Sequence, residues 1–323
     1  MAGEFRLDPH SGQWVNIVGH RQNRPNLPAD GCPFCPGGVE APDPYDTRWF
    51  ENRWPALAPG DPVDTTAAAA HGVTSLDAVG AAEVILYSPR HEGSLGSLGV
   101  AQIRKVVDLW AERTAALLAR PEVEYVLVFE SRGSEVGATI HHPHGQIYAY
   151  PFVPPSPAAE ASHARSLGID VVAAELEAEL ADGRRIVHDG GEWVAWVPYA
   201  SPYPYGLRLA PRSPIGRLDE LDEGQRDGLA EALADVLGRY DGLWPDDQAA
   251  SPIFPYLMWF HQAPKHGGGE WHLHCHLAPP QRSAGLARFI AAGEVGSGTL
   301  SNPVVPEDAA AALRRVSVAG HEG

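Results

Sequence analysis

Residues 98–131, LGVAQIRKVVDLWAERTAALLARPEVEYVLVFES, join an amphipathic helix to a buried strand. The apolar residues of the helical part follow the spacing of a helix that packs on one face. They are Ile103, Val106, Val107, Trp110, Thr114 and Leu117. A strand is predicted before this helix in EVILYSPRH (83–91), and another, after a glycine-containing loop, in HHPHGQIYAY (141–150). The predicted unit is therefore strand, helix, strand, loop, strand.

The second half of the chain repeats this order. The predicted elements are a strand, a helix, a strand and, after a glycine-rich loop, a last strand: GLRLAPRSP (206–214), residues 221–244, YLMWFHQ (256–262) and WHLHCHLAPP (271–280). The two halves also share residues: LYSPR precedes the first helix and LAPRS precedes the second. Each unit ends in a strand that contains His-x-His. These pairs are His142/His144 and His274/His276. An internal duplication explains this recurrence.

We therefore predict an α+β fold of two similar halves, with a mostly antiparallel sheet flanked by helices. The predicted halves are residues 1–165 and 166–323. Residues 5–60 are rich in Pro, Gly, Asn and Trp, and predict short strands and loops around Cys32-Pro33-Phe34-Cys35.

The bulk composition narrows the function classes. With 323 residues, 44% hydrophobic and 20% charged, the chain is long enough for one large core or two fused domains. A formal charge of −17 repels polyanions, which argues against nucleic acid or an anionic membrane as partner. No apolar run approaches a membrane span of about 20 residues. The three cysteines do not form a disulfide framework, so we expect a cytoplasmic protein.

Histidine pairs and cysteines are the candidate chemical groups. Alternate residues of a strand face the same side, so each His-x-His pair can present two imidazoles to a single site. A lone histidine is usually a satisfied surface or core residue, but five of the 15 fall within His261 to His276. Cys32 and Cys35 have the spacing of half a zinc site, and a pair of buried or redox-active cysteines is the alternative.

The motif His142-Pro143-His144-Gly145-Gln146 resembles the galactose-1-phosphate uridylyltransferases, a branch of the histidine triad superfamily. The resemblance runs from about Arg6 to Arg315, and includes SPRH (88–91), FPYLMWFHQAP (254–264) and WHLHCHLAPPQRSAGLARF (271–289). It implies that each half of the chain resembles a histidine-triad unit and that His144 is the nucleophile. His144 would attack the α-phosphorus of UDP-glucose and carry the uridylyl group in a ping-pong cycle that ends on a second sugar phosphate. Gln146 stands where related hydrolases carry a third histidine, which points to transfer rather than hydrolysis.

The resemblance also implies two metal sites. Cys32, Cys35, His91 and His142 would form a closed, structural zinc site. One carboxylate and three imidazoles, Glu160, His261, His274 and His276, would hold a second metal, iron or zinc. The alternative for both groups is solvated histidine without metal.

An acidic protein needs local positive charge to bind a dianionic substrate. The candidate cations in or near the motif segments are Arg21, Arg24, Arg53, Arg132 and Arg288. By resemblance, Asn52 lies near uracil and ribose, Arg132 and Thr139 near the phosphates, and Arg288 near the acceptor sugar phosphate. Each arginine could equally be a solvated surface charge.

The chain departs from the family pattern at four positions. Arg53 stands where Asp is usual, and Ser131 where Asn is usual. Gly293 and Leu300 lie near the places of a Tyr and a Gln that contact the hexose, so the choice of sugar is open. Competing functions are transfer of another nucleotide such as ADP, phosphorolysis of a nucleotide sugar, and a non-catalytic protein that binds zinc or nucleotide. The resemblance also implies a homodimer.

Overall fold

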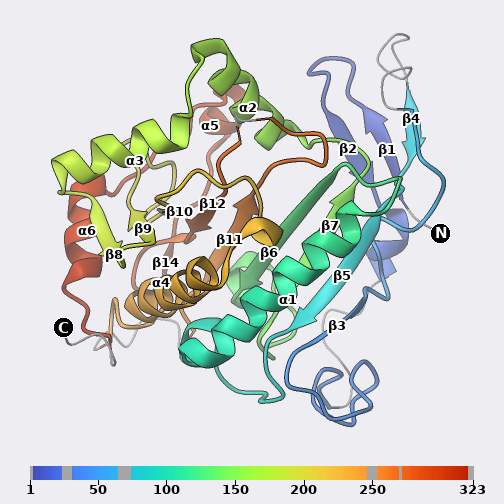
Figure 1. Cartoon of the computed structure of the whole chain (residues 1–323), viewed down its shortest axis with the longest axis horizontal. Coiled ribbons are helices and arrows are strands. Elements are labelled where there is room, and N and C mark those ends of the chain that lie inside the picture. The colour runs from blue at the N-terminus through green and yellow to red at the C-terminus, as the bar shows by residue number, and fades with distance from the viewer. Residues whose placement is uncertain (1–2, 24–30, 65–73, 246–252, 269–270, 319–323) are drawn as a thin grey trace.

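The computed structural model describes residues 3–23, 31–64, 74–245, 253–268 and 271–318. Nine strands form one sheet in the order β3-β5-β7-β6-β11-β12-β10-β9-β8, and every neighbouring pair is antiparallel (Figure 1). The strands are β3 Arg48–Glu51, β5 Ala81–Leu86, β6 Tyr125–Arg132, β7 His144–Tyr150, β8 Ile186–Asp189, β9 Trp193–Trp196, β10 Leu207–Pro211, β11 Tyr256–His261 and β12 His274–Ala278. The predicted mostly antiparallel α+β fold is confirmed.

The strand order is mirrored about the β6–β11 pair, which joins the two halves of the sheet. In chain order, β5-α1-β6-β7 of the first half is repeated by β10-α4-β11-β12 of the second. The helices α1 (Val100–Leu118) and α4 (Glu223–Asp241) contact each other on one face of the sheet (Figure 1). The boundary predicted between residues 165 and 166 lies inside α2 (Pro155–Leu167), and the division into two domains stays a prediction.

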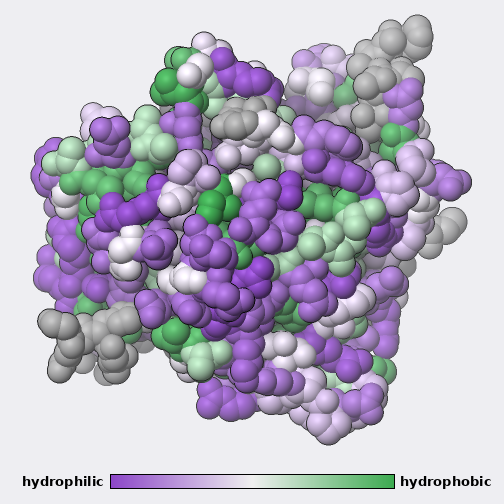
Figure 2. Space-filling view, viewed as in Figure 1, coloured by the Kyte–Doolittle hydropathy of each residue, from purple (hydrophilic) through white to green (hydrophobic). Residues whose placement is uncertain are grey.

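The two long helices form where local sequence favours them. All six apolar-face positions predicted for α1 are buried. At the start of α4, the Asp222 side chain accepts from the Gln225 backbone N–H at 2.8 Å, and the Gln225 side chain accepts from the Asp222 N–H at 2.9 Å. One large core, which includes Ile147, Ala149, Cys275 and Leu277, lies between these helices and the sheet. The outer surface of this face is mainly hydrophilic (Figure 2).

Alternation along the strands sends the remaining side chains to the opposite face. In β7, Gly145, Ile147 and Ala149 are buried on the helix side, so His144 and Gln146 point the other way. The same argument places His274 and His276 of β12 opposite α4. The candidate site residues on β7 and β12 therefore share the face of the sheet that α1 and α4 leave uncovered.

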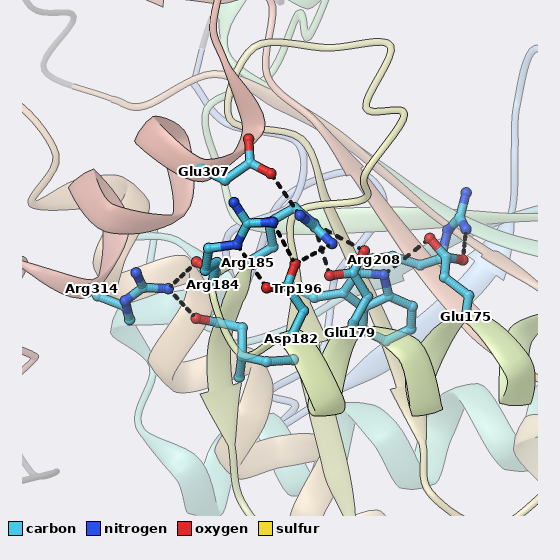
Figure 3. Close-up of polar contacts among 10 residues, drawn as sticks. Glu175, Glu179, Asp182, Arg184, Arg185, Trp196, Arg208, Glu307 and Arg314 are labelled. Atoms are coloured by element: carbon cyan, nitrogen blue, oxygen red, sulfur yellow. Dashed lines mark hydrogen bonds and ion pairs between the residues drawn. The ribbon is translucent and has the colours of Figure 1, made fainter.

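Among the described residues, four α-helices have no counterpart among the predicted elements: α2, α3 (Val171–Asp182), α5 (Ala292–Ser297) and α6 (Pro306–Arg314). Ion pairs tie α3 to the edge of the second half (Figure 3). Arg185 contacts Glu179 and Asp182 of α3 and Glu307 of α6 (Pro306–Arg314). Glu175 binds Arg208 and accepts from the Trp196 indole at 3.1 Å. These bonds hold α3 over strands β9 and β10.

Shorter elements complete the described chain. A small sheet with the order β2-β1-β4 contains β1 Glu4–Leu7, β2 Trp14–Ile17 and β4 Ser75–Asp77. A two-stranded hairpin near the C-terminus pairs β13 Gln281–Ser283 with β14 Leu286–Ala287 and precedes α5 (Ala292–Ser297). Within the described ranges, no helix is both long and apolar enough to cross a membrane.

Candidate active site and metal clusters

His144 begins strand β7, and a backbone contact fixes its tautomer. Its Nδ1 lies 2.7 Å from the carbonyl oxygen of His142, which can only accept, so Nδ1 carries the proton. Because a neutral imidazole carries one N–H, Nε2 is the unprotonated nitrogen with the nucleophilic lone pair. The loop before β7 therefore prepares His144 for attack through one defined ring atom.

A pocket opens beside His144 with one polar and one apolar part. The polar members are Glu40, Asn52, Arg53, Thr139, His144 and Gln146. The apolar members are Pro33, Phe34, Val39, Phe50, Trp54, Val84 and Ile140. Such a mixture suits a flat base and a charged phosphate in one ligand. A neighbouring cleft also borders His144 and is lined by Ser131, Arg132, Ser134 and His141 among others.

Two amide side chains meet in this pocket. The backbone N–H of Trp54 donates to Asn52 Oδ1 at 2.9 Å, and Asn52 Nδ2 donates to Gln146 Oε1 at 3.3 Å. The Asn52 backbone N–H is itself bonded to the oxygen of Ala82 at 2.8 Å, which extends the β3–β5 pairing. Asn52 is therefore in direct contact with the side chain expected to bind phosphate.

The first metal cluster consists of Cys32, Cys35, His91 and His142. His142 Nδ1 lies 3.8 Å from the Cys32 sulfur and 3.7 Å from the Cys35 sulfur, and His91 Nδ1 lies 3.5 Å from the latter. Tetrahedral zinc with usual bond lengths would separate sulfur and nitrogen ligands by about 3.6 Å. The donor set therefore fits zinc.

A backbone bond orients the His142 ring toward the cysteines. Its Nε2 lies 2.8 Å from the Ser88 carbonyl oxygen, so Nε2 holds the proton and Nδ1 presents its lone pair to the cluster. Burial lowers the pKa of His142, which favours the neutral form that binds a metal. Burial raises the pKa of Cys35, so deprotonation of this thiol needs a cation nearby.

The first His-x-His pair does not face a single site, contrary to the expectation from strand alternation. His142 precedes β7, and its ring joins the cysteine cluster, whereas His144 lies within β7 and lines the pocket. The Phe34 ring lies against both, with centroids 6.1 Å from His142 and 5.1 Å from His144. Alternation does not apply because the strand begins only at His144.

The second cluster joins Glu160 of α2 to His261, His274 and His276. Glu160 oxygens lie 2.7 Å from His261 Nδ1, 3.5 Å from His274 Nε2 and 4.0 Å from His276 Nε2. His274 Nδ1 donates to the His272 oxygen at 2.8 Å, so its Nε2 lone pair faces the carboxylate. Two acceptors that face each other need a cation between them, and this fits a metal.

The protonation states of the second cluster favour the binding of a cation. Burial, followed by the neighbouring His274 and His261, lowers the pKa of His276 well below its usual value, so the ring is neutral. Its buried Nε2 has no hydrogen-bond partner within the described part of the chain. Burial would raise the pKa of Glu160, but the neighbouring His261 and His274 outweigh it and lower that pKa.

The shared carbonyl bond shows which residues of the two halves correspond. His274 bonds to His272 as His144 bonds to His142, so His272, His274 and His276 match His142, His144 and Gln146. This shifts the correspondence by two residues from the His142/His144 and His274/His276 pairing in the sequence. His272 meets a carboxylate instead of a metal cluster, because its Nδ1 lies 2.9 Å from Asp170 Oδ2.

The structure brings only part of the predicted substrate-binding set to the pocket. Asn52, Arg53 and Thr139 line it, and Arg53 pairs with Glu40 at 2.9 Å. Arg21 lies in a short helical turn, Gly19–Asn23, and contacts the Tyr148 hydroxyl at 3.2 Å. Arg24 lies outside the described residues.

The other two arginines lie elsewhere. Arg132 borders the neighbouring cleft, but its side chain pairs with Asp241 at the end of α4 at 2.7 Å. Arg288 pairs with Glu294 of α5 and does not line the His144 pocket, and Gly293 belongs to the same helix. The roles of all these residues stay predictions.

The sequence analysis missed the apolar walls of the pocket and its carboxylate, Glu40. Phe34 lies between the two cysteines, and Phe50 and Trp54 flank Asn52, so proximity to motif residues was the available signal. Aromatic residues in short strands otherwise indicate core, which is why they were not selected.

These features define a class of protein: a duplicated antiparallel sheet whose histidines face a pocket in one half and a metal-ligand cluster in the other. Residues 2–154 match the family Galactose-1-phosphate uridyl transferase, N-terminal domain, and residues 158–322 match its C-terminal domain. The chain belongs to the galactose-1-phosphate uridylyltransferase family, so the predicted resemblance and a transferase activity are confirmed at the level of the family.

Similar proteins align over nearly the full length. The galactose-1-phosphate uridylyltransferase of Thermotoga maritima is 33% identical and the alignment covers 98% of this chain and 99% of that protein. That of Streptomyces lividans is 36% identical, with 97% and 87% covered. A solved uridylyltransferase structure has a TM-score of 0.83 at 28% identity, covering 96% of this chain and 97% of that chain. An ADP-glucose phosphorylase from Arabidopsis thaliana, at 23% identity and a TM-score of 0.73, shares the fold over 98% of this chain and 100% of its own.

Proposed function

We propose that the protein is a UDP-glucose:hexose-1-phosphate uridylyltransferase that acts through a uridylyl group on His144. The observation that carries the proposal is the bond from His144 Nδ1 to the His142 oxygen, which leaves Nε2 as the nucleophilic nitrogen. Full-length similarity to named uridylyltransferases supports the donor and the class of acceptor.

The two half-reactions follow from this geometry. His144 Nε2 attacks the α-phosphorus of UDP-glucose in line; the N–P bond forms as the P–O bond breaks, and glucose 1-phosphate leaves with the electron pair. The His142 oxygen stabilises the positive charge that develops on the ring. A phosphate oxygen of the hexose 1-phosphate then attacks the same phosphorus, the N–P bond breaks, and neutral His144 and the UDP-hexose result.

Gln146 favours transfer over hydrolysis. An amide cannot titrate, so Gln146 cannot deliver a proton to a leaving group, but its N–H can donate to a phosphoryl oxygen and hold the intermediate. Loss of one such donor typically costs on the order of 100-fold in rate.

The metals in this proposal support the site and take no step in the reaction. Zinc bound by Cys32, Cys35, His91 and His142 would hold the loop that carries the His142 carbonyl. A second metal, iron or zinc, bound by Glu160 and the three imidazoles would tie α2 to strands β11 and β12. Neither set of ligands lines the His144 pocket.

The acceptor is proposed only as a hexose 1-phosphate, with galactose 1-phosphate first by family. Gly293 and Leu300 stand where hexose contacts are usual, so another sugar 1-phosphate competes. ADP-glucose or inorganic phosphate as substrate, and binding without turnover, remain the alternatives that the experiment below separates. A cytoplasmic location stays a prediction that rests on the low cysteine count.

A homodimer is part of the proposal because the acceptor segment is not near His144 within one chain. Phe289 is 83% exposed and Val295 is 73% exposed, and they flank the Arg288–Glu294 pair. Exposed apolar side chains around a buried cation suit contact with a second copy. Light scattering of wild type and Phe289→Ser checks this, and a wild-type monomer that stays active at high dilution contradicts it.

The experiment for the function is an intact-mass measurement of the protein mixed with UDP-glucose and no acceptor, at neutral pH. We expect a uridylyl-sized gain, mapped to the peptide that contains His144, and no gain in His144→Ala. Labelling by ADP-glucose and not by UDP-glucose would mean that the enzyme transfers an adenylyl group. No gain with any donor would leave the non-catalytic binding protein.

A further inference from the structure

We infer that Asn52 is a positioning residue that orients the Gln146 amide so that its N–H groups face the transferring phosphoryl group. The inference rests on the proposed function and gives Asn52 a role other than the uracil or ribose contact that the resemblance implies. It follows from a chain of three hydrogen-bonding groups in which each orientation fixes the next.

The first step fixes Asn52 itself. Its backbone is bonded to Ala82 at 2.8 Å, which holds the residue at the end of β3. The backbone N–H of Trp54, which can only donate, lies 2.9 Å from the side chain, so the atom that faces it must be the oxygen Oδ1. The Nδ2 group is therefore directed away from Trp54, with two N–H donors.

The second step fixes Gln146. Asn52 Nδ2 lies 3.3 Å from Gln146 and donates, so the Gln146 atom that receives it must be the oxygen Oε1. With Oε1 held by Asn52, Nε2 occupies the other end of the Gln146 amide, in the pocket that His144 also lines. A phosphoryl oxygen is an acceptor and needs this donor end.

The opposite orientation would place a carbonyl oxygen against the phosphate. Two acceptors would then face each other, and the amide would repel the charge that it is expected to stabilise. The side chain at position 52 must therefore be an amide, because a carboxylate there still accepts from the Trp54 N–H but cannot donate to Gln146. It instead attracts the Gln146 N–H groups and turns the amide around.

This reasoning predicts an unusual order of variant activities, measured as the rate of His144 uridylylation by UDP-glucose under rapid mixing. Gln146→Ala should lose on the order of 100-fold. Asn52→Ala should lose less, because the amide becomes mobile but can still donate. Asn52→Asp should be at least as slow as Gln146→Ala, and adding Gln146→Ala to Asn52→Asp should cause no further loss.

A matched control is Asn302→Asp. Asn302 has the same arrangement, in which Val304 N–H donates to Oδ1 at 3.0 Å and Nδ2 donates to the oxygens of Ser201 and Tyr203. It removes equivalent donor bonds outside the His144 pocket, and we expect uridylylation within about twofold of wild type, within the scatter usual for changes remote from a site.

Three kinetic results would overturn the inference. They are a raised KM for UDP-glucose with unchanged kcat in Asn52→Asp, full additivity with Gln146→Ala, or activity of Asn52→Asp above that of Asn52→Ala. The side-chain amide signals of Asn52 in ¹⁵N NMR give a readout without turnover, because Gln146→Ala should shift them. Failure of wild type to form uridylyl-His144 would contradict the proposed function. An unshifted Asn52 signal would contradict only the inference that Asn52 orients Gln146.

Discussion

The Nδ1 atom of His144 lies 2.7 Å from the backbone oxygen of His142. This contact joins the two functions of the motif, because the same residue that offers its ring to the cysteine cluster offers its carbonyl to the nucleophile. A change at the metal cluster can therefore reach the reaction through one backbone group.

The tautomer leads to the first prediction: the uridylyl group is attached to Nε2 of His144. The Nδ1 proton is held by the carbonyl, so attack through Nδ1 would break that bond. Phosphorus-coupled ¹⁵N NMR of the isolated intermediate identifies the substituted nitrogen. Attachment at Nδ1 would contradict the tautomer derived from the structure.

The two metal clusters should be separable by mutation. We expect about two metal ions per chain, and Cys35→Ser or Glu160→Gln should each remove one, because each change removes one of four ligands. Elemental analysis measures this. Cys275→Ala is the control, because the Cys275 side chain lies on the face of β12 opposite its neighbours His274 and His276 and belongs to neither cluster, and this variant should retain both ions. Equal contents in all variants would mean that these residues bind no metal.

Gly145 should not tolerate a side chain. A Cβ there would lie 2.0 Å from the Tyr87 hydroxyl oxygen, on the helix side of β7. Gly145→Ala should lower the unfolding free energy by about 1–3 kcal/mol and slow uridylylation, and Tyr87→Phe should restore part of the stability. Gly224→Ala in α4 has no such contact and should be neutral or stabilising. Urea unfolding of wild type and these three variants makes the comparison, and a neutral Gly145→Ala would show that the strand can shift.

Glu130 should make stability depend on pH. Burial raises the pKa of its carboxyl to about 7, from 4.5 in the unfolded chain, although Arg132 and Tyr256 act in the other direction. Between these values only the folded state keeps the proton, so stability falls as pH rises from about 4.5 through 7, by about 3 kcal/mol in total. Glu130→Gln should remove this part of the slope. An unchanged slope in urea unfolding from pH 5 to 8 would contradict it.

The ion-pair cluster beside α3 offers a paired test of burial (Figure 3). Arg185 and Glu179 are 7% and 3% exposed, so Arg185→Ala leaves a buried carboxylate without its partner and should cost about 3–5 kcal/mol. Arg184, which pairs with Asp182, is 67% exposed, and Arg184→Ala should cost less than about 1 kcal/mol. Equal losses in thermal unfolding would show that burial does not decide the difference.

The local elements and the local chemistry can be predicted from the sequence. Helix α1 follows from its apolar spacing, and α4 follows from the repeated order of elements in the second half. The nucleophile motif and the paired cysteines were recognised because neighbours in the chain are necessarily neighbours in space. The helices α2 and α3 were not predicted, since their apolar faces are weak and few of their residues are buried; α3 packs against β9 and β10.

Contacts between side chains that are far apart in the sequence depend on the tertiary structure. The resemblance had already grouped Glu160 with His261, 101 positions apart, but nothing in the sequence indicated that Asn52 contacts Gln146, 94 positions away. Arg132 pairs with Asp241 because alternate residues of β6 face opposite sides of the sheet and Arg132 lies on the helix side. Strand order and packing bring these residues into contact, and no spacing within the sequence predicts these contacts.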